Sequence, residues 1–496
     1  MNTQTGQRDR TSPGLKRDLR TLEAAALSLG IVAPTLALSL NGVGVAGLVG
    51  RAVPLAFVFA AVGVALTVYG FQALAREYAH AGSVYAFTGA TLGPRAGFLA
   101  GWALLGFYLA SVPAAFAATG FFAATFLQNT GIWDGADWLV IGIPAAFLAW
   151  MIAAAKAKAA TRALLAFEIG TLALIVILFA VIVVKMASGS APAGSGFTLD
   201  VFSLPAGTDF HAVGLAAVFG FLSFAGFEGA ATLGEETSDP RRSIPRALII
   251  SVAVAAVIFV VGMAIESWGF GANSHGAAGF ASSGAPLSEL ASRFMSSGYG
   301  DVLVLGAAIS SFAAGIGNTA AANRMLFAIS RDSYLDRTTV RTLTRLNRSG
   351  VPIISLNLVV IQGVIVMIAL RIGGVSGVNA FFYTATIAVL SLIVAYLLLS
   401  CGAARFLSTR PVRRARALIP LLAVVFLGYT LYSNVIPVPD APARWFPYIA
   451  AGWLALGLGI VVLVPGLSRR IGLALGIGSA ADSQTPGVDP SLRTTL

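Results

Sequence analysis

One glutamate, Glu228, lies deep in the apolar first half of the sequence FGFLSFAGFEGAATLGEETSDPRRSIPRA, and Gly220 and Gly226 interrupt the same apolar segment. A charge in lipid costs on the order of several kcal/mol, and glycines loosen a helix, so both are tolerated mainly where the backbone lines a protein cavity. A helix broken within the membrane exposes free amide and carbonyl groups, which can hold a polar substrate. The chemistry that these residues predict is therefore substrate binding by a carrier.

A second interruption lies in the first apolar stretch, which reads Gly30-Ile31-Val32-Ala33-Pro34-Thr35. Pro34 lacks a backbone N–H and its ring clashes with the preceding turn, so we expect the helix to break here. The matching interruption in the sixth stretch runs from Ser223 to Gly226. Two broken helices at corresponding positions of two halves indicate a binding site between inverted repeats.

The composition predicts an all-α integral membrane protein. Of its 496 residues, 57% are hydrophobic and 11% are charged, and the mean hydropathy of +0.84 exceeds what a soluble surface permits. A helix needs roughly 20 apolar residues to cross a bilayer. About twelve such spans are expected, near Leu22–Val45, Val53–Ala75, Ala96–Leu127, Trp138–Ala155, Ala163–Met186, Ala212–Leu233, Ala247–Phe270, Val302–Ile329, Ile353–Leu370, Val378–Ala403, Leu418–Ile436 and Pro447–Val464.

These spans divide the chain into five expected parts. A polar tail (residues 1–21) precedes a first repeat of spans 1 to 5 (22–186), and a second repeat holds spans 6 to 10 (209–403). Spans 11 and 12 (416–466) follow as an addition suited to packing or dimer contacts. A second tail (467–496) ends the chain.

The basic residues predict the orientation. If the N-terminus is cytoplasmic, all but five of the 32 Lys and Arg fall in cytoplasmic segments. This asymmetry predicts a multi-pass protein of the cell membrane with both termini in the cytoplasm. It also explains the net charge of +11 through topology and contact with anionic lipid, without a nucleic-acid partner. The five exceptions are Arg51, Lys185, Arg293, Arg371 and Arg444.

Other classes of protein are disfavoured by the polar residues. Cys401 is the single cysteine, and His80, His211 and His275 fall in different loops, so neither a disulfide, a metal site nor a cofactor is expected. An enzyme would need a constellation of such residues near one interface. A channel would need a continuous polar stripe along a span, and none is evident.

Four segments resemble the amino acid-polyamine-organocation transporters. GFEGAATLGEETSDPRRSIPRA resembles the signature of their span 6. Ala81–Trp102 is similar to the family's loop between spans 2 and 3, Lys156–Arg162 to its approach to span 5, and Asn323–Arg337 to the end of its span 8. The resemblance covers spans 1 to 10. It implies a leucine-transporter-type fold of five plus five inverted repeats with two extra helices, which carries amino acids or amines by alternating access.

The resemblance also implies a substrate site. Amides of span 1 at Ala33, Pro34 and Thr35 would hold a substrate carboxylate. Carbonyls of span 6 would hold its amine, at Ser223, Phe224, Ala225 and Gly226. One departure matters, because most relatives carry a Gly-x-Gly where Ala33-Pro34-Thr35 stands, and proline offers no amide. Either the Thr35 hydroxyl compensates or the substrate lacks a carboxylate.

Coupling to an ion has several candidates. Glu228 matches a family glutamate that is linked to proton movement in some members, although it could instead tie broken backbone to span 1. Glu168 in span 5 could pair with Arg162 or lie at the cytoplasmic end, whereas Glu266 and Lys185 are expected to reach the interface. Thr171 stands where some members have a lysine. Ser310 and Ser311 offer hydroxyls for sodium or for close helix packing.

The pocket wall and the substrate complete the prediction. Phe221, Phe224 and Phe227 recur at three-residue spacing, which suits either a wall over the substrate or core packing. Leu222 stands at the gate position, where the family often has Trp, and Tyr108 and Tyr383 are candidates to add hydroxyls. Few charges in the core favour a neutral amino acid over a polyamine. Glu228 favours coupling to protons, with an exchanger or sodium coupling as the alternatives.

Overall fold

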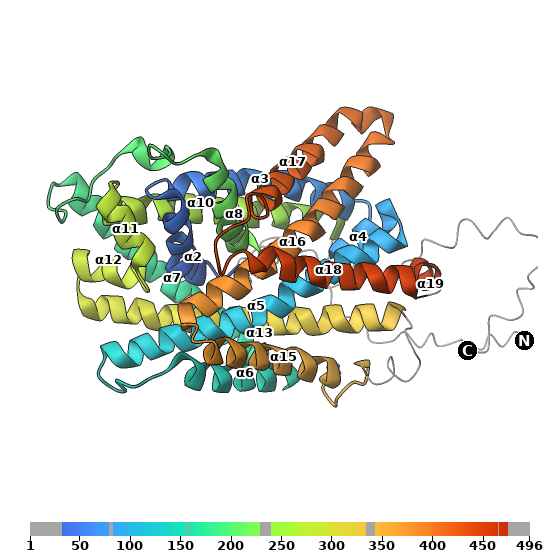
Figure 1. Cartoon of the computed structure of the whole chain (residues 1–496), viewed down its shortest axis with the longest axis horizontal. Coiled ribbons are helices and arrows are strands. Elements are labelled where there is room, and N and C mark those ends of the chain that lie inside the picture. Colours follow the sequence, from blue (N-terminus) through green and yellow to red (C-terminus); the bar gives the residue numbers. More distant parts are fainter. Residues whose placement is uncertain are drawn as a thin grey trace, which may run out of the picture.

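The computed structural model describes residues 32–78, 83–155, 158–228, 240–333, 343–464 and 466–474. Apart from an isolated bridge between Leu346 and Pro352, the regular structure in these ranges is helical (Figure 1). The first helices are α2 (Pro34–Val49), α3 (Val53–Ala75), α4 (Ser83–Leu92), α5 (Pro94–Asn129), α6 (Trp138–Ala155), α7 (Lys158–Ala187), the 3-10 turn η1 (Leu199–Phe202) and α8 (Phe210–Phe224). The later ones are α10 (Pro240–Phe270), α11 (Ser274–Ser282), α12 (Pro286–Phe294), α13 (Ser297–Ser333), α15 (Ile353–Ile372), α16 (Gly377–Ser408), η2 (Pro411–Ala417), α17 (Leu418–Ser433), α18 (Trp445–Leu463) and α19 (Leu467–Ala474).

Ten of the described helices are long and apolar enough to cross a membrane, so the chain is a multi-span helical membrane protein. They are α3, α5, α6, α7, α10, α13, α15, α16, α17 and α18, and they fall on predicted spans 2 to 5 and 7 to 12. The shorter apolar helices α2 and α8 fall on predicted spans 1 and 6. Because parts of those two spans lie outside the described residues, the count of twelve and the two repeats stay predictions.

Helix α5 lies at the centre of the bundle (Figure 1). It packs most extensively against α16 and α13, and it also contacts α4, α6, α15 and α18. Small residues permit the close approach, as is common where helices pack in membranes. A Cβ at Gly120 would overlap the carbonyl oxygen of Trp138, and one at Gly315 would lie 2.6 Å from the ring of Phe116.

Two tryptophans join α5 to α18. The rings of Trp102 and Trp453 stack with centroids 4.4 Å apart and planes 10° from parallel. The Trp102 indole N–H donates to the Trp453 carbonyl at 2.8 Å, and the Trp453 N–H donates to the Trp102 carbonyl at 2.9 Å. Buried indole N–H groups need an acceptor. This reciprocal pair satisfies both groups and fixes span 12 against span 3.

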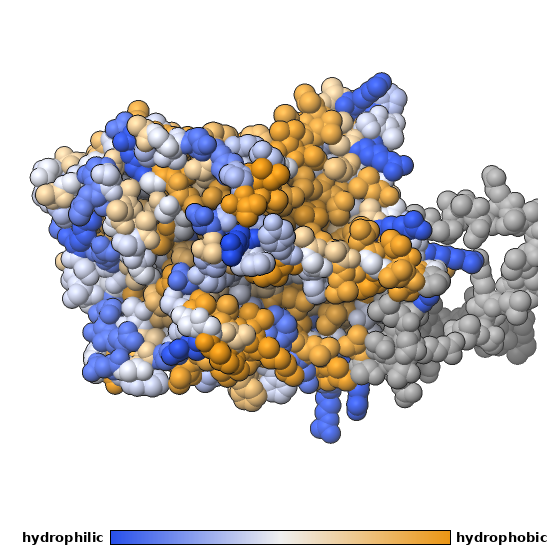
Figure 2. All heavy atoms as spheres, viewed as in Figure 1, coloured by the Kyte–Doolittle hydropathy of each residue, from blue (hydrophilic) through white to orange (hydrophobic). Residues whose placement is uncertain are grey.

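The outer helices present apolar side chains to the surroundings. Phe147 of α6, Ile365 of α15, Val425 of α17 and Val462 of α18 are all exposed. Figure 2 shows apolar residues over the middle of this face and hydrophilic ones toward the ends of the long helices. An apolar surface of this extent suits contact with lipid rather than water.

Between α10 and α13 the chain folds into α11 and α12, which were not expected from the sequence. They lie at the opposite end of the molecule from α4 and α19 (Figure 1). Asn273 accepts the N–H of Gly276 at 2.8 Å and so caps α11. Phe280 of α11 stacks on Phe270 with centroids 4.9 Å apart, and it lies beside Gly42 of α2. The pair of helices therefore covers one end of α2.

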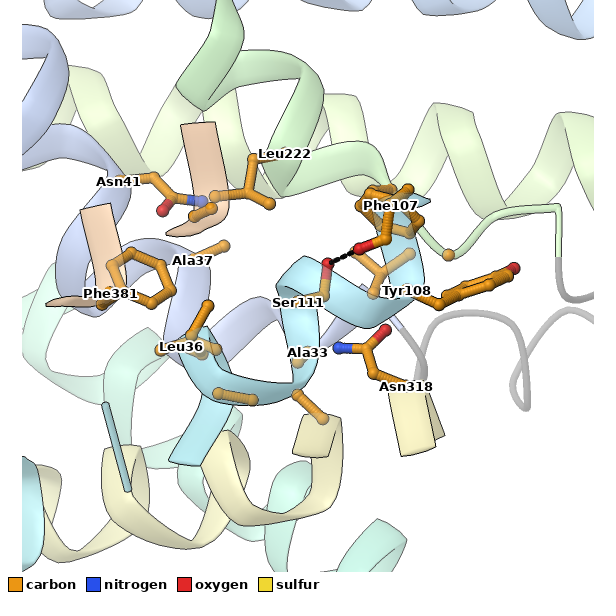
Figure 3. Close-up of a pocket in the computed structure, with 17 residues that line it drawn as sticks. Ala33, Leu36, Ala37, Asn41, Phe107, Tyr108, Ser111, Leu222, Asn318 and Phe381 are labelled. Atoms are coloured by element: carbon orange, nitrogen blue, oxygen red, sulfur yellow. Dashed lines mark hydrogen bonds between the residues drawn. The ribbon is translucent and has the colours of Figure 1, made fainter. Parts of the chain in front are cut away.

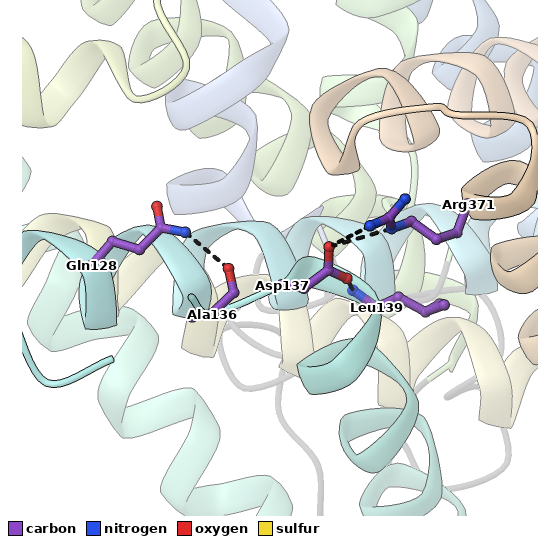
Figure 4. Close-up of polar contacts among 5 residues, drawn as sticks. All are labelled: Gln128, Ala136, Asp137, Leu139 and Arg371. Atoms are coloured by element: carbon purple, nitrogen blue, oxygen red, sulfur yellow. Dashed lines mark hydrogen bonds and ion pairs between the residues drawn. The ribbon is translucent and has the colours of Figure 1, made fainter. Parts of the chain in front are cut away.

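Ion pairs join helices at both ends of the bundle. Asp137, just before α6, binds Arg371 in the last turn of α15 at 3.2 Å and also accepts the N–H of Leu139 (Figure 4). At the other end Glu77, after α3, accepts two hydrogen bonds from Arg410, after α16, at 2.7 and 3.1 Å. These hydrogen bonds raise the pKa of the Arg410 guanidinium.

We expect Gly120→Ala to lower the free energy of unfolding by about 1–3 kcal/mol, because the new methyl group would collide with backbone that cannot rotate away. Gly452→Ala on α18 is the matched control, since nothing lies within 4 Å of a Cβ there. The measurement is the Tm of the purified protein in detergent. Equal Tm values for the two variants would contradict the packing described for α5 and α6.

Candidate functional site

The first helix break lies at Ala33. This residue has φ 50° and ψ 62°, in the left-handed region, and it is the only non-glycine residue in the described ranges with positive φ. That conformation costs an L-residue about 1–2 kcal/mol. Val32 before it is helical, and Pro34 opens α2, where its missing N–H is not required. Ala33 therefore separates α2 from Val32, the one described residue that precedes it in span 1.

Glu168 of α7 and Ser310 of α13 occupy the N-terminus of α2. The Thr35 N–H donates to Glu168 Oε1 at 2.9 Å, and the Leu36 N–H donates to Ser310 Oγ at 3.2 Å. Glu168 is only 6% exposed. A carboxylate in this position satisfies a free amide and interacts favourably with the helix dipole. Glu168 and Ser310 together cap α2 within the protein interior.

This cap corrects one expectation and bears on a second. From the sequence we expect Glu168 to pair with Arg162 or to lie at the cytoplasmic end, but it reaches Thr35, 133 positions earlier in the chain. We also expect the Thr35 amide to receive a substrate carboxylate, whereas this amide is already bonded to a side chain of the protein. Pro34 has no amide to offer.

The second break follows Phe224, the last residue of α8. The Ala225 N–H donates to the carbonyls of Phe221 and Leu222 at 3.0 and 3.1 Å, and Gly226 takes φ 108°, which favours glycine. The described chain continues as a turn to Glu228. Helix α8 therefore ends inside the protein, with its carbonyl end toward Gly226.

Glu228 binds the broken backbone to two neighbouring helices. Its Oε2 accepts the Gly226 N–H at 2.9 Å and the Tyr396 hydroxyl of α16 at 2.8 Å, while Oε1 accepts the Tyr108 hydroxyl of α5 at 3.3 Å. Glu228 is 1% exposed. Three donors around one buried carboxylate are the arrangement that makes its burial tolerable. These contacts give Glu228 a structural role, because they join the turn after α8 to α5 and α16 rather than to span 1.

Asn41 links the two halves of the site. Its Nδ2 donates to Ser223 Oγ at 2.7 Å, and the Ser223 hydroxyl donates in turn to the Phe219 carbonyl at 2.9 Å. Asn41 Oδ1 has no hydrogen-bond partner among the described residues, although the residue is 2% exposed. One buried acceptor is therefore left open on α2.

A cavity lies between the two breaks (Figure 3). Residues of α2, α5, α13 and α16 line it, together with Ala33 at the first break and Ala225 and Gly226 at the second. The space that the centres of water molecules can occupy in this cavity is about 60 Å³. This is several times the volume that one water molecule needs. None of the described side chains that line it carries a charge. The polar ones are Asn41, Tyr108, Ser111 and Asn318.

The remaining residues predicted for the substrate do not line this cavity. Pro34, Thr35, Ser223 and Phe224 are absent from its wall. Thr35 and Ser223 instead hold α2 in place through the contacts above. The predicted site therefore divides into residues that face the cavity and residues that support them.

The phenylalanine stripe packs into the core. Phe221 lies against Gly63 of α3, the ring of Phe224 meets that of Phe259 at 5.3 Å, and the ring of Phe227 meets that of Phe71 at 5.3 Å. This is the packing alternative for the three-residue spacing. The cavity wall is made instead by Leu222 and by two aromatic residues that the sequence did not indicate, Phe107 and Phe381.

The two candidate tyrosines, Tyr108 and Tyr383, lie in different surroundings. Tyr108 lines the cavity and donates to Glu228, whereas the ring of Tyr383 packs on Phe446 of α18 with centroids 5.2 Å apart and does not line the cavity. Tyr396, 13 residues further along α16, is the residue that reaches Glu228. Both tyrosines of α16 look alike in the sequence, so only the packing distinguishes them.

The other coupling candidates make local contacts. The Thr171 hydroxyl donates to the Phe167 carbonyl and the Ser311 hydroxyl to the Ala307 carbonyl, each within its own helix. Ser310 accepts an amide of α2 rather than facing its carbonyls. Glu266 is 0% exposed, not at the interface, and neither of its oxygens has a hydrogen-bond partner in the described part of the chain.

A multi-span helical bundle with two helix breaks meeting at one cavity is the architecture of a membrane transporter rather than an enzyme. The comparison with known families agrees: the amino acid permease family matches residues 24–435, so the chain belongs to that family.

Individual relatives match a smaller part of the chain than the family does, and at low sequence identity. The low-affinity putrescine importer PlaP of Escherichia coli K12 is 26% identical over 248 residues, 50% of this chain and 52% of the importer. The branched-chain amino acid permease BcaP of Bacillus subtilis is 27% identical over 271 residues, 51% of this chain and 54% of the permease. An uncharacterized transporter of Mycobacterium tuberculosis is 29% identical over 338 residues, 65% of this chain and 68% of that transporter. The chain thus spans about half the length of the first two.

We expect Tyr396→Phe to lower the free energy of unfolding by about 1–3 kcal/mol, because it removes a donor from a buried carboxylate. Tyr383→Phe is the matched control on the same helix, with a half-buried ring and no hydrogen bond to Glu228. Thermal unfolding of both variants in detergent provides the comparison. A Tyr383→Phe variant that loses as much stability would show that the Glu228 contact is not responsible.

Proposed function

We propose that the chain is a secondary active transporter that moves a small substrate bearing an ammonium group across the cell membrane by alternating access. The observation that carries this proposal is the meeting of both helix breaks, Ala33 and Ala225–Gly226, in one cavity. The carbonyl end of α8 favours a positive group. The arrangement of two five-span repeats, with both termini in the cytoplasm, belongs to the same proposal.

The uncharged wall of the cavity supports a substrate whose remaining part is neutral. A neutral amino acid and a simple amine both meet this condition. The relatives include a putrescine importer and a branched-chain amino acid permease, so they do not separate the two substrate classes.

Proton coupling through Glu228 is the favoured driving reaction. With three donors aimed at the carboxylate, a proton on either oxygen forces one tyrosine hydroxyl to turn from donor to acceptor. Tyr108 lines the cavity, so a change in its hydrogen bond is felt where the substrate binds. Sodium coupling has less support, because Ser310 and Ser311 already use their hydroxyls within the protein.

We expect Glu228→Gln to abolish accumulation driven by a pH gradient while sparing substrate binding and counterflow. Glutamine retains most hydrogen bonds, since a tyrosine hydroxyl can rotate to accept from its amide, but it cannot exchange a proton. The assay is uptake into proteoliposomes with and without an imposed pH gradient, and with and without sodium.

Glu266→Gln is the matched control, as it changes a second fully buried carboxylate of the described residues. Loss of gradient-driven uptake in Glu266→Gln alone would move proton coupling to α10. Equal loss of binding and transport in Glu228→Gln would leave Glu228 with a structural role only.

A further inference from the structure

The first turn of α2 has no amide left for a substrate carboxylate. Pro34 has no N–H, Thr35 donates to Glu168, Leu36 donates to Ser310, and Ala37 donates to the Ala33 carbonyl at 3.2 Å. A helix N-terminus attracts an anion because these amides are free and carry partial positive charge. Here Glu168 supplies that anion from α7, on a side of α2 that does not line the cavity.

The polar side chains around the cavity are short of donors. The amide of Asn41 is bonded to Ser223, the Ser111 hydroxyl donates to the Phe107 carbonyl at 2.8 Å (Figure 3), and the Tyr108 hydroxyl donates to Glu228. Asn318 is the exception, with an amide that has no partner in the described ranges.

Acceptors remain open on the same side chains. Asn41 Oδ1 is buried without a partner, and the hydroxyl oxygens of Ser111 and Tyr108 keep lone pairs after donating. A carboxylate binds to hydrogen-bond donors, whereas a primary ammonium group can donate to as many as three hydrogen-bond acceptors. The balance of donors and acceptors therefore matches an ammonium group and does not match a zwitterion.

We infer that Glu168 takes the place of a substrate carboxylate, and that the transported molecule is a primary amine without a free carboxylate. The inference rests on the proposed transport function and names its substrate class. Glu168 supplies within the protein the negative charge that an amino acid brings with it, so a cationic amine enters a site already supplied with a counter-charge. This reverses the preference for a neutral amino acid that the sequence alone favours.

The test uses pairs of ligands that differ only in the carboxylate: ethylamine with alanine, 3-methylbutylamine with leucine, and putrescine with ornithine. Binding to the purified full-length protein is measured by calorimetry, and uptake is measured in proteoliposomes. In each pair for which binding is detected, we expect the wild-type protein to bind the amine at least tenfold more tightly. Tighter binding of alanine and leucine than of their amines would overturn the inference.

Glu168→Ala is expected to reverse the preference, because it frees the Thr35 N–H to donate to a substrate carboxylate that enters the space left by the glutamate side chain. Leucine binding should improve at least tenfold relative to 3-methylbutylamine. Glu168→Gln gives a second readout that preserves the fold, since its amide oxygen still accepts from Thr35 while the charge is lost. We expect amine affinity to fall at least tenfold in Glu168→Gln, and unchanged amine affinity there would refute the counter-charge role.

Glu289→Gln, at an exposed position of α12, is the control and should match the wild-type protein. Failure of the inference is distinguishable from failure of the proposed function. Saturable counterflow of leucine but not of the amines would contradict only the substrate inference. Absence of counterflow for every compound would contradict the proposed transport function.

Discussion

The architecture of the site depends on one constraint: a backbone amide freed inside a bilayer must find an acceptor within the protein. Each broken helix meets this constraint with a buried glutamate. The Thr35 amide bonds to Glu168 and the Gly226 amide bonds to Glu228, both at 2.9 Å. The first glutamate arrives from a distant helix and the second from two residues away, so one joins α7 to the site and the other folds the chain back on itself.

The positions of the helices follow closely from the sequence. Helices α3 and α6 begin and end at the predicted residues, Val53–Ala75 and Trp138–Ala155. Long apolar runs must be helical in lipid, so hydropathy alone suffices for them. Helices α11 and α12 were missed because they are short and lie outside the apolar runs. Their stability comes from contacts such as Phe280 on Phe270, which are formed only in the folded protein.

The site was less accessible to sequence reasoning. Glycine, proline and a lone glutamate mark the breaks, so Ala33 and Gly226 could be found by local rules. The partner of Glu168 could not, because contacts across 133 residues depend on how helices pack. The same limit applies to Tyr396 and Tyr383, which share a helix and a residue type but face different neighbours. Residues such as Asn318 and Phe381 carry no local signal at all.

The reciprocal tryptophan pair has a mechanical consequence. Two stacked rings and two crossed hydrogen bonds resist both sliding and separation of α5 and α18. Because α5 also packs along α16 and α13, these helices form a stiff frame. In the proposed alternating-access cycle, we expect the motion that opens the cavity to each face in turn to bend at α2 and α8. Ala33, held in a left-handed conformation, and Gly226, which follows α8, are the positions where we expect this bending, because neither lies within a regular helix.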